Sequence, residues 1–120
     1  MKGARRWSGD LLDHGKDPQT PVAVVRWCSR AWQQTVRCTL GTVAEVVEET
    51  GLRPPALFVV GKVVDRSPCL SWFQTRPLFG TTVLVAGSEG TAVKLRSQFS
   101  ERGAEVVHQP VIRVVDPPNW

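Results

Sequence analysis

The spacing of hydrophobic and polar positions changes several times along the chain, and each change marks an expected element. PVAVVRW (residues 21–27) is almost wholly apolar and rich in β-branched side chains, which predicts a buried strand. QTVRC (34–38) alternates between polar and apolar residues and predicts a short strand. In TLGTVAEVVEETG (39–51) apolar residues fall on one side and glutamates on the other. This pattern predicts a helix that Thr39 or Thr42 can cap and that Gly51 ends.

Glycine and proline mark further element ends in the first half of the chain. SGDLLDHG (8–15) predicts the end of a helix, because Gly15 suits the left-handed position that follows a helix. RPPALFVVGKVV (53–64) predicts a loop that leads into a strand, with its entry fixed by the two prolines. Within it, residues 57–60 are expected to be too apolar for a solvated surface.

The second half of the chain starts a new pattern. It predicts a strand TVLVA (82–86), a loop GSEG (87–90), a helix over 91–103 and a strand AEVVHQP (104–110). The helix is expected to make its apolar contacts through Ala92, Val93, Leu95 and Phe99. Strand, helix and strand in about 30 residues form a βαβ unit with parallel strands. One such unit cannot cover both faces of its sheet, so it is expected to open a larger domain.

The fold class predicted for the whole chain is therefore α/β. Residues 1–72 are expected to be the closing part of one α/β domain. The segment CLSWFQTRPLFG joins that end to the incomplete βαβ unit.

Charge is unevenly distributed. Seven Lys and Arg residues against three Asp residues give residues 1–38 the net charge of +4 that the whole chain carries. Such a basic segment attracts anions, among which are nucleic acids, membrane surfaces and polycarboxylates, but scattered basic residues are also typical of a solvated face. Because no helix combines a basic face with interleaved aromatic residues, neither a nucleic-acid nor a membrane partner is expected.

Cysteine usage and the apolar runs predict a cytoplasmic protein. Cys28, Cys38 and Cys69 are odd in number and form no C-x-x-C pair, which argues against a disulfide framework and against a zinc site. The N-terminus lacks the layout of a signal peptide. No apolar run approaches the roughly 18 residues that span a bilayer.

Side chains that could do chemistry are sparse. GSEG lacks the phosphate-binding glycine motifs and reads as a plain turn between strand and helix. His14 and His108 are expected to be surface residues, and no catalytic set is visible. The strand starts in TPVAVV and RPPAL leave backbone N–H and C=O groups at strand ends, where such groups can read an adenine edge. An ordinary buried strand is the alternative at both places.

Several ordered segments, spanning roughly residues 10–80, resemble the tetrapyrrole methylase family. HGKDPQTPVAVVRW, QQTVRCTLGTVAEVVEETGLRPPALFVVGKVV and LSWFQTRPLFG resemble the C-terminal part of the uroporphyrinogen-III C-methyltransferases. RPLFGTTVLVAGSEGTAVKLRSQFSERGAEVVHQPVIRV resembles the start of a uroporphyrinogen-III synthase. The resemblance implies a methylase part at residues 1–75, a synthase-like part at 76–120, and a fragment of a bifunctional protein.

The resemblance also implies an activity, a cofactor and a set of contacts. Members of the family transfer methyl groups from S-adenosylmethionine to uroporphyrinogen III, which gives precorrin-2. The C-terminal subdomain supplies backbone contacts to the cofactor, and the matching positions are Pro21, Ala23, Cys28, Pro55, Ala56 and Leu57. The family usually has glycine at the positions of Cys28 and Cys38, and V-T-R where this chain has V-A-G at 85–87. A side chain at Cys28 is expected to crowd an approach that glycine permits.

Two readings follow. In the first, the chain belongs to a methylating enzyme with uroporphyrinogen III as substrate and a homodimeric parent, whose proton-handling residues lie upstream of this sequence. In the second, it is a catalytically inactive α/β remnant that serves only as a binding or interaction module.

Overall fold

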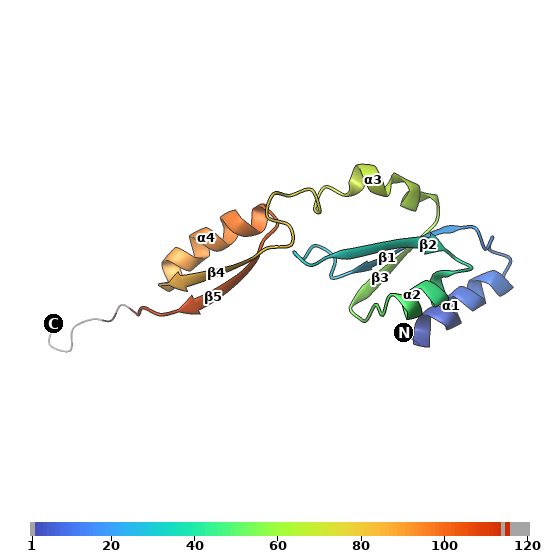
Figure 1. The fold of residues 1–120 in the computed structure, drawn as a ribbon, viewed down its shortest axis with the longest axis horizontal. Helices are drawn as coiled ribbons and strands as arrows, with labels where there is room; N and C mark the ends of the chain where they lie inside the picture. The colour runs from blue at the N-terminus through green and yellow to red at the C-terminus, as the bar shows by residue number, and fades with distance from the viewer. Residues whose placement is uncertain (1, 114, 116–120) are drawn as a thin grey trace. The chain divides into compact units, whose positions relative to one another are not determined.

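The structure, a computed structural model, describes residues 2–113 and residue 115. It divides into two compact units (Figure 1). The first unit comprises Met1–Ser29 and Gln33–Trp72, and the second comprises Arg30–Trp32 and Phe73–Trp120. Both combine helices with a sheet, so the predicted α/β class is confirmed.

The first unit has a three-stranded sheet in the order β2-β1-β3, with both strand pairs antiparallel. Its elements are α1 (Lys2–Asp13), β1 (Pro21–Arg26), β2 (Gln34–Thr39), α2 (Val43–Glu49), β3 (Ala56–Val60), the 3-10 helix η1 (Lys62–Arg66) and α3 (Ser67–Leu70). The central strand is β1, whose residues Val22, Ala23 and Val24 are buried, and the prediction of a buried strand there is confirmed.

The core of the first unit lies between one face of this sheet and the helices α1 and α2 (Figure 1). Val22 and Val24 of β1 are 0% exposed, and Val43 and Val47 of α2 pack on them. α1 contributes the buried residue Ala4. Burial of such side chains away from water is the main stabilising term of a small domain.

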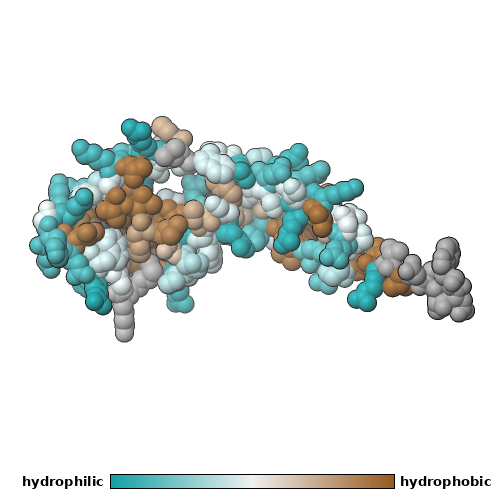
Figure 2. Space-filling model, turned by 180° about the vertical axis from the view of Figure 1, so that it is seen from behind, coloured by the Kyte–Doolittle hydropathy of each residue, from teal (hydrophilic) through white to brown (hydrophobic). Residues whose placement is uncertain are grey.

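The opposite face of the sheet is covered only in part: η1 contacts β1 and β3, and Ala23 is buried there, but two side chains of β3 are exposed. The register places Leu57 and Val59 of β3 beside Val25 and Ala23 of β1, so all four side chains lie on this face. Leu57 is 57% exposed and Val59 is 38% exposed. The expectation that residues 57–60 avoid a solvated surface is therefore wrong for these two, because α1 and α2 pack on the other face of the sheet. Figure 2 shows hydrophobic side chains gathered over the first unit.

The predicted boundaries hold for α2 and fail for the end of β3. α2 begins at Val43 with Thr42, one of the two predicted threonines, at its N-cap position, but the hydroxyl of Thr42 bonds to that of Thr39 at 3.1 Å and makes no capping hydrogen bond. Gly51 has a φ of +62° and ends the helix as predicted. The strand expected through residue 64 stops at Val60, because Gly61, with a φ of +118°, turns the chain into η1.

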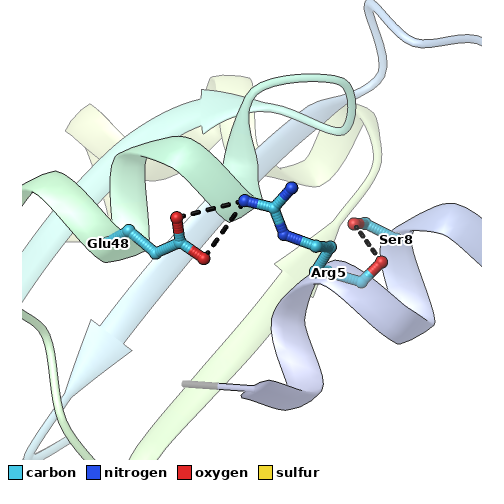
Figure 3. Close-up of polar contacts among 3 residues, drawn as sticks. All are labelled: Arg5, Ser8 and Glu48. Carbon is cyan, nitrogen blue, oxygen red and sulfur yellow. Dashed lines mark hydrogen bonds and ion pairs between the residues drawn. The ribbon is translucent and has the colours of Figure 1, made fainter.

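A surface ion pair links the two helices of the first unit (Figure 3). Arg5 of α1 lies 3.1 Å from a carboxylate oxygen of Glu48 in α2. One turn along α1, the buried Ser8 donates its hydroxyl to the carbonyl oxygen of Arg5 at 3.4 Å. Arg5 thus takes part in one contact between the two helices and one within α1.

The second unit is the predicted βαβ arrangement. β4 (Thr82–Gly87) and β5 (Glu105–Pro110) are parallel, and α4 (Glu89–Glu101) connects them. α4 starts two residues earlier than predicted, so Glu89 and Gly90 belong to its first turn and not to a loop. Its buried contacts come from Ala92, with Leu95 and Phe99 half-buried beside Val85 and Val106.

Two side chains show how incomplete the cover of this sheet is. Val93, expected among the apolar contacts of the helix, is 65% exposed and lies on its outer side, so that expectation is wrong. Leu84 of β4 is also 65% exposed, on the sheet face opposite α4. A single helix covers one face of a two-stranded sheet, as the sequence pattern predicted.

Candidate cofactor-binding site

Four of the six predicted contact residues meet at one end of the first sheet. Arg26 is paired with Ala56, and Val25 with Leu57, so the end of β1 lies beside the start of β3. The backbone N–H of Trp27 donates to the carbonyl oxygen of Pro55 at 3.3 Å and extends this pairing beyond the strands. We call the residues gathered here the strand-end cluster: Cys28, Pro55, Ala56 and Leu57.

The other two predicted contact residues lie elsewhere on β1. Pro21 is at the opposite end of the strand, where its carbonyl oxygen accepts a hydrogen bond from the N–H of Gly61 at 2.8 Å. At about 3.3 Å per residue, Pro21 is about 17 Å from Arg26. Ala23 lies in the middle of the strand and is 5% exposed between its neighbours Arg37 and Val59. The structure therefore does not bring Pro21 or Ala23 into the strand-end cluster.

The cluster offers apolar surface beside backbone hydrogen-bonding groups. Cys28, Pro55 and Leu57 are exposed and Ala56 is half-buried. Among the strands that the structure describes, β3 pairs only with β1. Alternate residues of β3 therefore direct their N–H and C=O groups away from β1, where a ligand can bind them. A flat heteroaromatic ring needs such a combination of apolar contact and a few directed polar groups.

The loop after β1 has an unusual backbone. Trp27 and Ser29 have φ values of 51° and 62°, a region that non-glycine residues seldom adopt. Cys28, at a position where the resemblance implies glycine, is not among the residues with a positive φ. The loop is closed by Ser29, whose N–H donates to the side-chain oxygen of Gln33 at 2.8 Å. The sequence gives no signal for this geometry, since neither positive-φ residue is a glycine.

Arg26, which sequence reasoning did not select, lies opposite Ala56 of the strand-end cluster. Its guanidinium carbon lies 3.9 Å from the centroid of the Trp27 ring. Its Nε is buried and has no hydrogen-bond partner among the described residues. The one signal in the sequence is the adjacent pair Arg26–Trp27 at the end of an apolar strand.

Cys38, at the second position where the resemblance implies glycine, is part of the hydrophobic core. Cys38 is half-buried in β2, opposite Val22, and packs on the core. Burial raises the pKa of the Cys38 thiol, so this sulfur stays protonated at neutral pH. Over the described residues, no group of three or more His, Cys, Asp or Glu side chains could hold a metal ion.

The second unit contains a cavity at the start of α4. It has a volume of about 720 Å³ and is lined by Ser88, Glu89, Gly90 and residues 110–113. The Ser88 hydroxyl bonds to that of Thr91 at 3.1 Å, and Glu89 puts a carboxylate in the first turn of the helix. That carboxylate already complements the positive end of the helix dipole and repels a phosphate. That GSEG is a plain turn and not a phosphate loop stays a prediction.

The histidines differ from each other in their surroundings. His14 is exposed, as predicted, and its Nδ1 lies 2.7 Å from the carbonyl oxygen of Asp10. His108 is half-buried rather than on the surface, with its Nε2 buried.

Among the helices that the structure describes, none combines the length and the apolar character that a membrane span requires.

Comparison with known proteins places these features in context. No protein-family model matches the chain. Porphyrin biosynthesis protein HemD of Ruminiclostridium josui is 35% identical over 109 residues, which are 91% of this chain and 22% of that protein. Uroporphyrinogen-III C-methyltransferase of Bacillus subtilis is 30% identical over 108 residues, which are 90% of this chain and 22% of that enzyme. The chain's relatives are porphyrin-biosynthesis proteins.

The match to the Bacillus subtilis enzyme confirms the predicted resemblance to uroporphyrinogen-III C-methyltransferases. The chain spans about a fifth of the length of the curated relatives described above. A solved structure, the uroporphyrin-III C-methyl transferase from Thermus thermophilus complexed with S-adenyl homocysteine, is 38% identical. The match covers 52% of this chain and 27% of that one, with a TM-score of 0.45.

Proposed function

We propose that the chain is part of a bifunctional porphyrin-biosynthesis enzyme. Residues 1–75 form the C-terminal part of a uroporphyrinogen-III C-methyltransferase domain, and residues 76–120 form the beginning of a uroporphyrinogen-III synthase-like domain. The relative from Ruminiclostridium josui supports this arrangement, because its match of 109 residues is longer than either part and includes residues of both. In this proposal the parent protein is a cytoplasmic homodimer.

The proposed reaction of the parent is methyl transfer from S-adenosylmethionine to uroporphyrinogen III, which gives precorrin-2. The observation that carries the proposal for this chain is the meeting of Cys28 with Pro55, Ala56 and Leu57 at one sheet end. There the exposed apolar surface and the outward backbone groups of β3 suit an adenine ring. A contact between the cofactor and Pro21 or Ala23 stays a prediction, since neither lies in the cluster.

Bound cofactor would supply an activated methyl group, and the residues of this chain would hold the cofactor in position. Holding two reactants in an aligned geometry removes much of the entropic barrier of a bimolecular step. The exposed face of Leu57 and the fixed loop after β1 would orient the adenosine part. The net charge of +4 on residues 1–38 would favour a polycarboxylate substrate such as uroporphyrinogen III.

Equilibrium dialysis of the 120-residue chain with labelled S-adenosylmethionine tests the proposed site. Leu57→Glu places a charge in the cluster at a side chain that is already 57% exposed, so folding is expected to survive. Val63→Glu is the matched control, because Val63 is 52% exposed on η1 outside the cluster. We expect Leu57→Glu to weaken binding about tenfold or more and Val63→Glu to leave it within about twofold. Equal affinities of the two variants would remove the cluster from the site.

A further inference from the structure

Arg26 differs from the arginines that form ion pairs in the described part of the chain. Arg5, Arg30 and Arg37 each lie within ion-pair distance of a carboxylate. For Arg26 the structure shows a stack of the guanidinium on the Trp27 indole at 3.9 Å and a buried Nε with no hydrogen-bond partner among the described residues. A buried donor without an acceptor costs free energy, and an anion bound at the terminal N–H groups of the same half-buried guanidinium stabilises its charge.

The indole of Trp27 determines how the guanidinium can be used. Stacking on an aromatic face holds the planar group in one orientation and leaves its edge available. A guanidinium edge presents parallel N–H donors that match the two oxygens of a carboxylate. The positive φ of Trp27, at 51°, turns this side chain back over its neighbour, whereas an extended strand would direct the two side chains to opposite faces.

Arg26 belongs to the same sheet end as the strand-end cluster. Its directly opposed residue on β3 is Ala56, a member of the cluster. Opposed residues of an antiparallel pair have Cβ atoms about 5 Å apart. The next residue, Trp27, is hydrogen-bonded through its N–H to Pro55, another member of the cluster. Arg26 and Ala56 share one face of the sheet, and Leu57 lies on the other. A ligand that binds across the strand ends, against Pro55 and Ala56, therefore comes within reach of a stacked cation.

We propose that Arg26, oriented by Trp27, is a binding residue for a carboxylate group of the ligand at the strand-end cluster. The inference rests on the proposed function and extends it, because it names a side chain and the ligand group that it recognises. Two ligands of that reaction carry carboxylates: the amino-acid end of the methyl donor and the acidic side chains of the tetrapyrrole. Both offer the same planar anion to the guanidinium.

Titration of the full 120-residue chain with S-adenosylhomocysteine, and separately with uroporphyrin III, tests the inference and distinguishes the two sources. Arg26→Gln removes the charge, Arg26→Lys keeps the charge without the planar fork, and Arg6→Gln makes the same charge change at an exposed position of α1. We expect Arg26→Gln to weaken one ligand about tenfold or more, Arg26→Lys to weaken the same ligand less, and Arg6→Gln to change neither by more than about twofold. The ligand affected identifies the source of the carboxylate.

A second readout makes the inference independent of the methylase assignment. The Nε–H nuclear magnetic resonance signal of Arg26, identified by its loss in Arg26→Gln, is followed during addition of benzenehexacarboxylate at constant ionic strength. We expect a saturable shift that the same ionic strength of sodium chloride does not produce. If Arg26→Gln fails to fold, the signal is identified by its loss in Arg26→Lys, and that variant then decides the question.

The outcomes separate the two claims. If the wild-type chain binds neither cofactor nor tetrapyrrole while the Nε–H signal shifts, the proposed function fails and the carboxylate site stands. If the wild-type chain binds a ligand, Arg26→Gln binds it equally well and the Nε–H signal does not move, the carboxylate role of Arg26 is overturned and the proposed function stands. If the chain binds nothing and the signal does not move, both claims are wrong.

Discussion

The backbone N–H of Trp27 donates a hydrogen bond to the carbonyl oxygen of Pro55, with the two atoms 3.3 Å apart. This bond continues the β1–β3 pairing past Arg26 and Ala56, so the loop that leaves β1 starts beside the segment that enters β3. Cys28 follows Trp27, and Leu57 follows Ala56. Two stretches that are far apart in the sequence thereby form one exposed sheet end, on which the proposed cofactor site depends.

Replacement of Cys28 by glycine tests whether its side chain crowds that site. Cys28 is exposed in the cluster and stands where the methylase family usually has glycine. We expect Cys28→Gly to bind S-adenosylhomocysteine about fivefold more tightly, because removing the Cβ allows the ligand to approach the backbone. Cys28→Ser is the control, since it keeps a side chain of similar size and is expected to show no gain. Calorimetric titrations in which both variants match the wild type would show that Cys28 does not obstruct binding.

Two glycines of the second unit are expected to differ in how much their replacement by alanine destabilises that unit. Gly103 has a φ of +95°, and a Cβ there would lie 2.8 Å from the Cβ of Arg76. Gly80 has a φ of +80° with no other atom within 4 Å of the added Cβ. We expect Gly80→Ala to cost about 1 kcal/mol through backbone strain alone and Gly103→Ala to cost at least about 1 kcal/mol more, through the clash. Hydrogen exchange of the β4 and β5 amides measures both costs, and equal protection in the two variants would contradict the predicted clash.

The Arg5–Glu48 ion pair is expected to contribute little to stability. Its side chains are 69% and 57% exposed, so water and salt screen the attraction over the 3.1 Å that separates them. A double-mutant cycle with Arg5→Ala and Glu48→Ala is predicted to give a coupling free energy below about 1 kcal/mol, which decreases in 1 M salt. Urea unfolding of the four proteins provides the measurement. A coupling well above this value, or one that salt leaves unchanged, would contradict a screened surface pair.

Burial is expected to make Cys38 the least reactive thiol of the chain. It raises the pKa of Cys38, and the thiolate is the form that alkylating agents attack, whereas Cys28 and Cys69 are exposed. We expect mass spectrometry after iodoacetamide treatment at pH 8 to show slower modification of Cys38 than of the other two. Equal rates at the three sulfurs would show that Cys38 is accessible.

The same shift has a consequence for stability at high pH. Because the folded-state pKa of Cys38 lies above the unfolded value of about 8.5, its contribution is fully present below that pH and is lost as the pH rises through the folded pKa. The free energy of unfolding is therefore expected to fall more between pH 7 and pH 10 in the wild type than in Cys38→Ala. An identical fall in both proteins would rule out Cys38 as its source.

Local sequence patterns were sufficient to predict most elements of both units. β1 was predictable because its apolar run needs cover on both faces, and β4, α4 and β5 because strand and helix periods alternate there. The exposure of Leu57 and Val93 was not predictable in this way. An apolar run shows no preference for either face, and which face is covered depends on how many helices pack on the sheet.

The candidate site was predictable only in part. The resemblance grouped Pro21 with Cys28 and Leu57, but the antiparallel register places Pro21 at the other end of β1. The stack of Arg26 on Trp27 depends on a positive φ at Trp27, for which a non-glycine residue gives no sequence signal. Both features follow from tertiary pairing and loop geometry, which the order of residues alone does not specify.

The most direct test of the central claim is calorimetric titration of the purified 120-residue chain with S-adenosylhomocysteine, after circular dichroism has shown that the chain is folded. The account predicts saturable binding at one site, because the exposed sheet end formed by Cys28 and residues 55–57 retains contacts to the cofactor. The absence of binding heat from a folded chain, at two temperatures, would contradict it. The catalytically inactive remnant would then be the better description of this protein.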